Sequence, residues 1–271
     1  MSSLNDSLNP ISLQKPNGQP PNLPPMDEYG NLLPQLLAEP RVCQAGWGVN
    51  WITKAFAIFK DQFLLWLAIG VAYLIIAVIG SSVPVVKFIF PFISFVFVGG
   101  IIKGCADQAT GRELKFDHLF SAFNTHLMPL IILFVLYLVA MIVMMIPMLI
   151  VFGSMLASLA QESSNVAIVG ILIGTLLVSL LLLPVLMAIW FAPALIVLHD
   201  IEPVRAMKMS FKGCLKNILP FLVFWIVAPI IMILAVVFTL GLGILILLPI
   251  GMITYYTSYR DVWTDQPLSA A

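Results

Sequence analysis

Histidine–aspartate pairs are the residues of this sequence that come nearest to a reactive site. Asp117–His118 and His199–Asp200 are adjacent in the chain, and both pairs lie beside long apolar stretches. Imidazole and carboxylate groups together can ligate a metal or transfer protons. If the ends of those stretches meet in space, one polar site could form from His118, His199, Asp107 and Asp200. The alternative, which we favour, is that each pair simply faces water at a helix end.

Recognised catalytic motifs are absent from the sequence. It contains no HExxH, no GxSxG and no phosphate-binding glycine loop. The three cysteines, Cys43, Cys105 and Cys214, have no CxxC spacing, so we expect free thiols near the cytoplasmic side. The sequence therefore predicts no catalytic residues, no metal and no cofactor, and we expect that the protein is not an enzyme.

Composition indicates which elements position these residues. Of 271 residues, 61 % are hydrophobic and only 10 % are charged, whereas a soluble domain carries about 25 % charged residues. A soluble core of this length could not bury so much apolar surface, so the bilayer must be the main solvent. The net charge is zero and the 13 basic residues are scattered, which argues against nucleic-acid binding.

Long apolar stretches predict an all-α membrane protein of about six transmembrane helices, since a span needs roughly 20 apolar residues. The six stretches are Phe63–Gly80, Phe88–Cys105, Leu127–Phe152, Val166–Leu198, Ile218–Phe238 and Leu242–Tyr259. The fourth is too long for one straight span. Pro184 and Pro193 predict a kink in it, because proline removes a helix hydrogen bond; a broken or partly re-entrant helix is the alternative.

Basic residues predict the orientation of these spans. Of the 13 lysines and arginines, all but Lys87 fall on one side of the six stretches. Basic residues are retained in the cytoplasm during insertion, so we expect both termini there. The chain is thus predicted to be a multi-pass protein of the bacterial inner membrane.

A short amphipathic stretch precedes each odd-numbered span, as an interfacial helix would. The first of these places Lys54 on its polar face. In the third, the apolar line is Val204, Met207, Phe211, Leu215 and Ile218, and the opposite face carries Arg205, Lys208, Lys212 and Lys216. We hypothesise that these four cations, called the basic stripe below, bind anionic lipid headgroups. The alternative is that they only fix the topology.

Two further patterns concern how the helices pack. Pro91, Pro184 and Pro249 are each followed sixteen residues later by an aspartate, namely Asp107, Asp200 and Asp265. This spacing favours three pseudo-repeats of interfacial helix, span and proline-bearing span, with chance as the alternative. Small residues spaced four apart, Gly100 with Gly104 and Gly170 with Gly174, predict close helix packing inside the bundle, with dimerisation as the alternative.

The ends of the chain differ in character from the apolar middle. Residues 1–40 contain eight prolines and no apolar periodicity, so we expect a disordered cytoplasmic tail. The first residues also lack a signal-peptide pattern, and we expect none to be cleaved. Residues 41–265 form the predicted transmembrane domain, and residues 266–271 a short C-terminal tail.

Three stretches carry a family resemblance: GWGVNWITKAFAIFKDQF, FAPALIVLHDIEPVRAMKMSFKGCLKN and LGLGILILLPIGMITYYTSYRDVW. Together they resemble an uncharacterised proteobacterial family of small polytopic inner-membrane proteins, over roughly Val42 to Trp263. The chain is more distantly similar to the membrane domains fused to some glycerophosphodiester phosphodiesterases. The family has no established activity, so the resemblance implies a fold and a location but no catalytic residues.

These observations predict a structural or binding membrane protein that interacts with lipids or proteins. The expected partners are membrane lipids, including anionic phospholipids, and a second copy or another membrane protein. The alternative is a permease or channel for a small or amphiphilic solute. A polar, water-wide interior would favour transport, whereas a filled apolar interior would favour binding.

Overall fold

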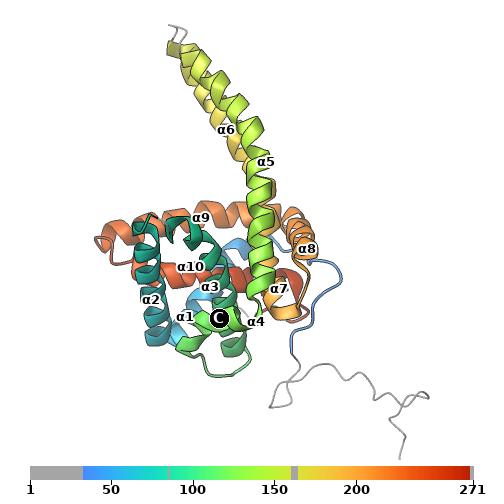
Figure 1. Cartoon of the computed structure of the whole chain (residues 1–271). Helices are drawn as coiled ribbons and strands as arrows, with labels where there is room; N and C mark the ends of the chain where they lie inside the picture. Colours follow the sequence, from blue (N-terminus) through green and yellow to red (C-terminus); the bar gives the residue numbers. More distant parts are fainter. Residues whose placement is uncertain (1–32, 85, 160–163, 269–271) are drawn as a thin grey trace, which may run out of the picture. The chain divides into compact units, whose positions relative to one another are not determined.

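The computed structural model describes residues 33–84, 86–159 and 164–268. The chain divides into two units, Met1–Pro34 and Gln35–Ala271, and all described helices belong to the second (Figure 1). They are α1 (Trp47–Asp61), α2 (Phe63–Ser82), α3 (Val86–Ala109), η1 (Phe116–Phe120), α4 (Ser121–Thr125), α5 (Leu127–Leu159), α6 (Ser164–Trp190), α7 (Ala192–His199), α8 (Pro203–Lys216), α9 (Ile218–Phe238) and α10 (Ile244–Trp263). An isolated bridge is the only β-pairing in the described residues, so the all-α prediction is confirmed.

In the described part of the chain, five helical segments are long and apolar enough to cross a membrane: Phe63–Ser82, Ile89–Ala109, Leu127–Gly153, Ile168–His199 and Ile218–Phe238. The predicted sixth span, Leu242–Tyr259, falls in α10, which is not among them. The second half of α10 is polar and includes Arg260 and Asp261, and most of its residues are buried between other helices. Six spans are therefore not confirmed.

The fourth predicted span consists of two helices. Helix α6 ends at Trp190 and α7 begins at Ala192, so the helix is broken at Phe191, as in the alternative to the kinked span expected first. The two helices together still form one candidate span, Ile168–His199. The hydroxyl of Ser210, from α8, lies where one α-helical hydrogen bond would be: it accepts from Phe191 N (2.9 Å) and donates to the Met187 carbonyl (2.6 Å). A side chain inserted in this way satisfies the backbone groups that the break leaves free.

The short helices pack against the three helices that carry the prolines of the sixteen-residue spacing. Helices η1 and α4 contact α3, α8 contacts α6 and α7, and α1 contacts α10. Pro91, Pro184 and Pro249 lie inside α3, α6 and α10 respectively. The short helices η1, α4 and α8 therefore pack against the one of these three helices that precedes them in the chain. The first short helix, α1, packs against the last of the three, α10.

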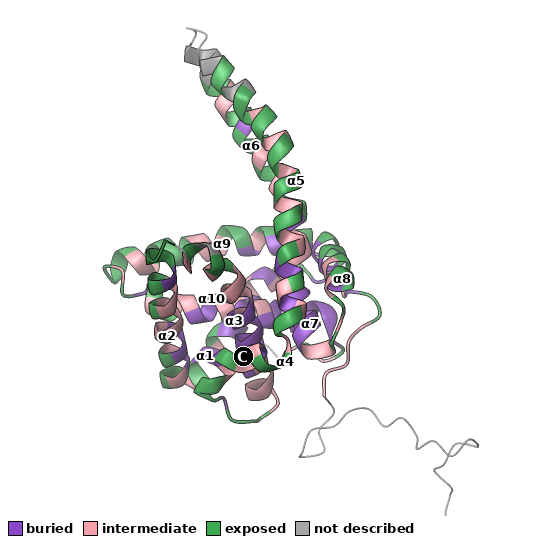
Figure 2. Ribbon diagram, viewed as in Figure 1, coloured by how far each residue is buried: buried purple, intermediate pink, exposed green. Residues whose placement is uncertain are grey.

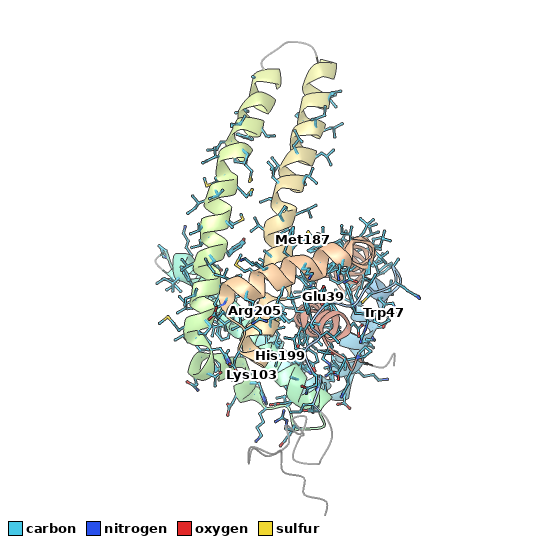
Figure 3. The ribbon with its side chains drawn as sticks, turned by 90° about the vertical axis from the view of Figure 1, so that its right-hand side faces the viewer. Glu39, Trp47, Lys103, Met187, His199 and Arg205 are labelled. Carbon is cyan, nitrogen blue, oxygen red and sulfur yellow. The ribbon has the colours of Figure 1, made fainter. Side chains whose placement is uncertain are left out.

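Helices α5 and α6 lie side by side as an antiparallel pair (Figures 1 and 3). Large apolar side chains cover the outside of this pair, and many are exposed (Figure 2), among them Ile142, Ile146, Ile150, Leu172 and Leu176. Exposed apolar surface on this scale is what a lipid bilayer would cover. The buried core instead lies where the short helices meet α3, α7 and α10, and its largest side chains include Trp51, Trp66, Trp263, Tyr256 and Tyr259.

Residues 35–43, called the strap below, lie along the end of α10. Leu37 N donates to the Trp263 carbonyl (2.9 Å), and Arg41 N donates to the Val262 carbonyl (2.8 Å). The predicted tail boundary at residue 40 is therefore too late, because backbone pairing already begins at Gln35. The disorder predicted for the tail concerns residues that, up to residue 32, lie outside the described part of the chain.

The first prediction separates the tail from the strap. Removing residues 1–32 should leave the thermal stability in detergent unchanged, because the backbone pairing of the strap with α10 involves residues 35–43. Removing residues 1–40 should lower the free energy of unfolding by about 1–3 kcal/mol, since it deletes two or three backbone hydrogen bonds. Thermal unfolding of both truncations measures this, and equal melting temperatures would contradict a docked strap.

Candidate functional site

Helix α8 presents three faces rather than the two predicted. Its buried face consists of small residues: Ala206, Ser210, Gly213 and Cys214. The predicted apolar line is largely exposed, at Val204, Phe211, Leu215 and Ile218. The four residues of the basic stripe are exposed on the remaining face. The helix therefore attaches to the protein by its small residues and leaves an apolar and a cationic face open side by side.

Two members of the basic stripe form ion pairs with the strap. Lys212 Nζ lies 2.5 Å from Glu39 Oε1, and Lys216 Nζ lies 3.0 Å from Glu39 Oε2. The hydrogen bonds from Lys212 and Lys216 lower the pKa of Glu39, so this carboxyl group is ionised at neutral pH. Arg205 and Lys208 have no ion-pair partner among the described residues.

The first glycine pair lies at a close contact within the chain. A Cβ atom added to Gly100 would lie 2.4 Å from the His118 carbonyl oxygen and 2.7 Å from that of Leu119. One added to Gly104 would lie 2.8 Å from Leu114 Cδ1. These glycines let α3 approach η1, a short helix, rather than another long one.

The second pair lies on α6, which packs along α5. Gly174 is buried and Gly170 is half-buried.

The histidines and aspartates of the predicted polar site fall into separate pairs. His118 Nε2 lies 2.8 Å from Asp107 Oδ2. The Arg112 guanidinium forms an ion pair with the other oxygen of this carboxylate, Oδ1, at 2.8 Å. The hydrogen bond to Asp107 raises the pKa of His118. This pair joins the end of α3 to η1.

The other two members have different partners. Asp200 Oδ1 lies 2.8 Å from His126 Nε2, and His199 hydrogen-bonds the Tyr259 hydroxyl. No group of three or more metal-ligating side chains occurs among the residues described. The four predicted residues thus do not converge on one site, and the groups at these helix ends are used in separate contacts between elements.

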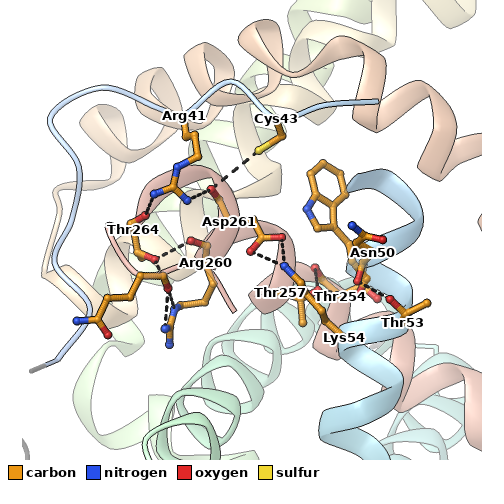
Figure 4. A network of polar contacts seen from close by, with 12 residues as sticks. Arg41, Cys43, Asn50, Thr53, Lys54, Thr254, Thr257, Arg260, Asp261 and Thr264 are labelled. Atoms are coloured by element: carbon orange, nitrogen blue, oxygen red, sulfur yellow. Dashed lines mark hydrogen bonds and ion pairs between the residues drawn. The ribbon is translucent and has the colours of Figure 1, made fainter. Parts of the chain in front are cut away.

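A buried ion pair between α1 and α10 was missed by the sequence analysis. Lys54 Nζ lies 2.9 and 2.8 Å from the two carboxylate oxygens of Asp261 (Figure 4). The side chains are only 6 % and 0 % exposed, so the placement of Lys54 on a solvent face is wrong. The signal in the sequence was helical spacing, because Lys54 lies three residues after Trp51 and next to Ala55, on the same side of α1. The structure buries both Trp51 and Ala55 completely.

The strap is joined to the same network. The Arg41 guanidinium donates to the carbonyls of Asp261 and Thr264, both at 3.0 Å (Figure 4). Asn217, between α8 and α9, accepts from Cys43 N (2.7 Å) and donates to the Arg41 carbonyl (2.9 Å). The strap therefore connects the start of α9 to the end of α10.

The three cysteines are free thiols, as predicted, and all three are buried. Cys43 lies in the strap, and burial raises its pKa to about 12. The thiol is therefore protonated and unreactive at neutral pH.

The geometry defines a class of protein: a multi-pass helical membrane protein with an amphipathic, cationic helix packed on its surface. A family model described as a domain of unknown function, DUF7847, matches residues 48–268. The chain belongs to this family.

A probable inner membrane protein of Burkholderia thailandensis is 24 % identical over 184 residues, which cover 63 % of this chain and 67 % of the relative. No solved structure matches the chain. The predicted uncharacterised family and the inner-membrane location are confirmed.

Proposed function

We propose that this protein binds anionic phospholipid headgroups through the basic stripe of α8 and acts as a structural or binding protein. The observation that carries the proposal is the division of α8 into three faces, with the apolar and cationic faces both open. Such a helix can place its apolar side chains in the acyl region and its cations at the phosphates. Near an anionic surface each basic residue contributes about 1 kcal/mol, so four contribute on the order of 4 kcal/mol before screening.

The packing of the core supports binding over transport. Large aromatic side chains fill the region between α1, α7 and α10. The buried charges Lys54 and Asp261 are paired with each other rather than facing an open path. A permease or channel for a small solute is the alternative, and it would need a polar route through these helices.

We also infer six spans and cytoplasmic termini. The strap is hydrogen-bonded to the end of α10, so these segments share one side of the membrane and the number of crossings between them is even. Adding α10, whose first half is apolar, to the five candidate spans gives six. The same side then carries the basic stripe, as expected for the cytoplasmic side.

Thiol labelling tests this orientation. A cysteine replacing Leu242, in the exposed turn between α9 and α10, should react with a membrane-impermeant reagent added to spheroplasts. A cysteine replacing Lys208 should react only after the membrane is opened. The native thiols are buried and can remain. Labelling of residue 208 alone from outside would reverse the inferred orientation.

The remaining expectations fit this proposal. The three groups α1–α3, η1–α7 and α8–α10 each contain a short helix, a long helix and then a helix that carries Pro91, Pro184 or Pro249. This order supports three pseudo-repeats, although α5 and α9 also contain internal prolines. The predicted distant similarity to membrane domains fused to some glycerophosphodiester phosphodiesterases stays a prediction, and a lipid-binding role is compatible with it. Neither catalysis nor a homo-oligomer or protein partner is needed for headgroup binding.

The experiment for the proposed function uses Arg205 and Lys208, the two cations of the stripe that have no ion-pair partner among the described residues. Arg205→Gln with Lys208→Gln removes about 2 kcal/mol of headgroup attraction, so phosphatidylglycerol should bind roughly 30-fold more weakly. Native mass spectrometry of delipidated protein, titrated with phosphatidylglycerol or phosphatidylcholine, measures the affinity. The matched control is Lys60→Gln with Lys115→Gln, which removes two exposed charges outside α8. Equal loss in both variants, or no loss in either, would contradict a site on α8.

A further inference from the structure

The strap carries a carboxylate on the surface proposed to bind phosphates. We propose that Glu39 is a built-in competitor that occupies Lys212 and Lys216 until an anionic lipid headgroup displaces it. The inference rests on the proposed function and adds its regulation. The basic stripe would thus have two states: one in which Glu39 occupies Lys212 and Lys216, and one in which Glu39 has left and all four cations can bind headgroups.

The contact geometry suits exchange with a phosphate. Each oxygen of Glu39 contacts one lysine, at 2.5 and 3.0 Å, and the lysines lie one turn apart on α8. Two oxygens of a phosphodiester can take the same positions, and both groups are anionic acceptors for lysine. The carboxylate therefore occupies the place where a headgroup would bind.

The contact is also open to displacement. The side chain of Glu39 is 58 % exposed, and those of Lys212 and Lys216 are 50 % and 38 % exposed. Ion pairs at such exposure are weak because water and salt screen them. By contrast, the Lys54–Asp261 pair beneath the strap is almost completely buried.

The backbone around Glu39 allows it to leave without unfolding the strap. Ala38 and Glu39 form an exposed bend. Leu37 before it and Arg41 after it are both hydrogen-bonded to the end of α10. The bend is therefore a short segment between two fixed points, and its movement frees the two lysines while the rest of the strap stays in place.

The test compares phosphatidylglycerol binding by the full chain and its variants in native mass spectrometry. Glu39→Gln should bind phosphatidylglycerol about tenfold more tightly than the wild type, because both lysines become free. Adding Lys212→Gln and Lys216→Gln to that variant should abolish the gain. If Glu39→Gln leaves the affinity unchanged while Arg205→Gln with Lys208→Gln weakens it, the strap contact is structural only and the inference fails. If Arg205→Gln with Lys208→Gln also leaves the affinity unchanged, the proposed function fails.

A second readout needs no change at Glu39. A spin label on Ala38→Cys should become more mobile when phosphatidylglycerol is added and should stay unchanged with phosphatidylcholine. An unchanged signal with both lipids would overturn displacement. An equal response to inorganic phosphate at the same concentration would overturn the assignment to a lipid.

Discussion

Asp261→Ala is expected to lower the free energy of unfolding by about 3–5 kcal/mol, the largest effect of any single substitution considered. The change leaves the ammonium group of Lys54, only 6 % exposed, without its carboxylate. An uncompensated buried charge is far more costly than the loss of an exposed pair. For a chain of this length the melting temperature should fall by on the order of 10 °C.

Two further variants make the Asp261 measurement specific. Combining Lys54→Met with Asp261→Leu should recover most of the lost stability, since well-packed apolar residues can replace a buried ion pair. Asp117→Ala, at an exposed aspartate of η1, should change stability by less than about 0.5 kcal/mol. If Asp261→Ala behaves like Asp117→Ala in thermal unfolding, α1 and α10 are not joined by this pair.

Gly100→Ala is expected to have the second-largest effect, a loss of about 1–3 kcal/mol or more. The added methyl group would lie 2.4 Å from the His118 carbonyl oxygen, so α3 and η1 would have to separate. Gly251→Ala is the matched control, because nothing lies within 4 Å of a Cβ atom there. The control should be neutral or should stabilise α10 by up to about 1 kcal/mol through helix propensity.

The same pair of variants distinguishes the two interpretations of the glycine spacing. Packing within the chain predicts that Gly100→Ala lowers the melting temperature of a monomer in detergent. Dimerisation through Gly100 and Gly104 predicts instead that the monomer is unaffected and that an oligomer dissociates. Thermal unfolding combined with size measurement in detergent separates these outcomes.

The apolar stretches predicted the helical class and the approximate position of each long helix, because twenty apolar residues in a row leave few alternatives to a membrane. The break between α6 and α7 remained open, although Pro193 indicated its neighbourhood. Its position depends on Ser210, which inserts between Met187 and Phe191 from another helix. A single sequence contains no signal for a contact of that kind.

Ion pairs between residues far apart in the chain could not be predicted from the sequence either. Glu39 and Lys212 are 173 residues apart in the chain, and a proline-rich segment gave no reason to expect a docked strap. The spacing of the first amphipathic stretch wrongly predicts that Lys54 lies on a polar face at the membrane interface. The structure instead buries Trp51, Ala55 and Phe59 and leaves Phe56 half exposed.

The basic stripe was found from spacing alone, since four cations at helical intervals define a face. The third face of α8, made of small residues, could be identified only from the packing in the structure. Its members Ala206, Ser210 and Gly213 are neither strongly apolar nor charged, so the sequence gives no signal for it. That face determines which side of α8 remains open. The sequence thus predicted the candidate residues, and the structure supplied the direction in which they are presented.

Photo-crosslinking at residue 208 tests lipid binding by α8 most directly. A photoreactive lysine analogue at this position, in the full chain within membranes of mixed lipid, can be activated and its lipid adducts identified by mass spectrometry. Headgroup binding predicts adducts in which phosphatidylglycerol or cardiolipin exceeds its share of the bulk lipid several-fold, with no such enrichment for an analogue at Lys60. Adducts in bulk proportion at both positions would contradict an anionic-lipid site on α8.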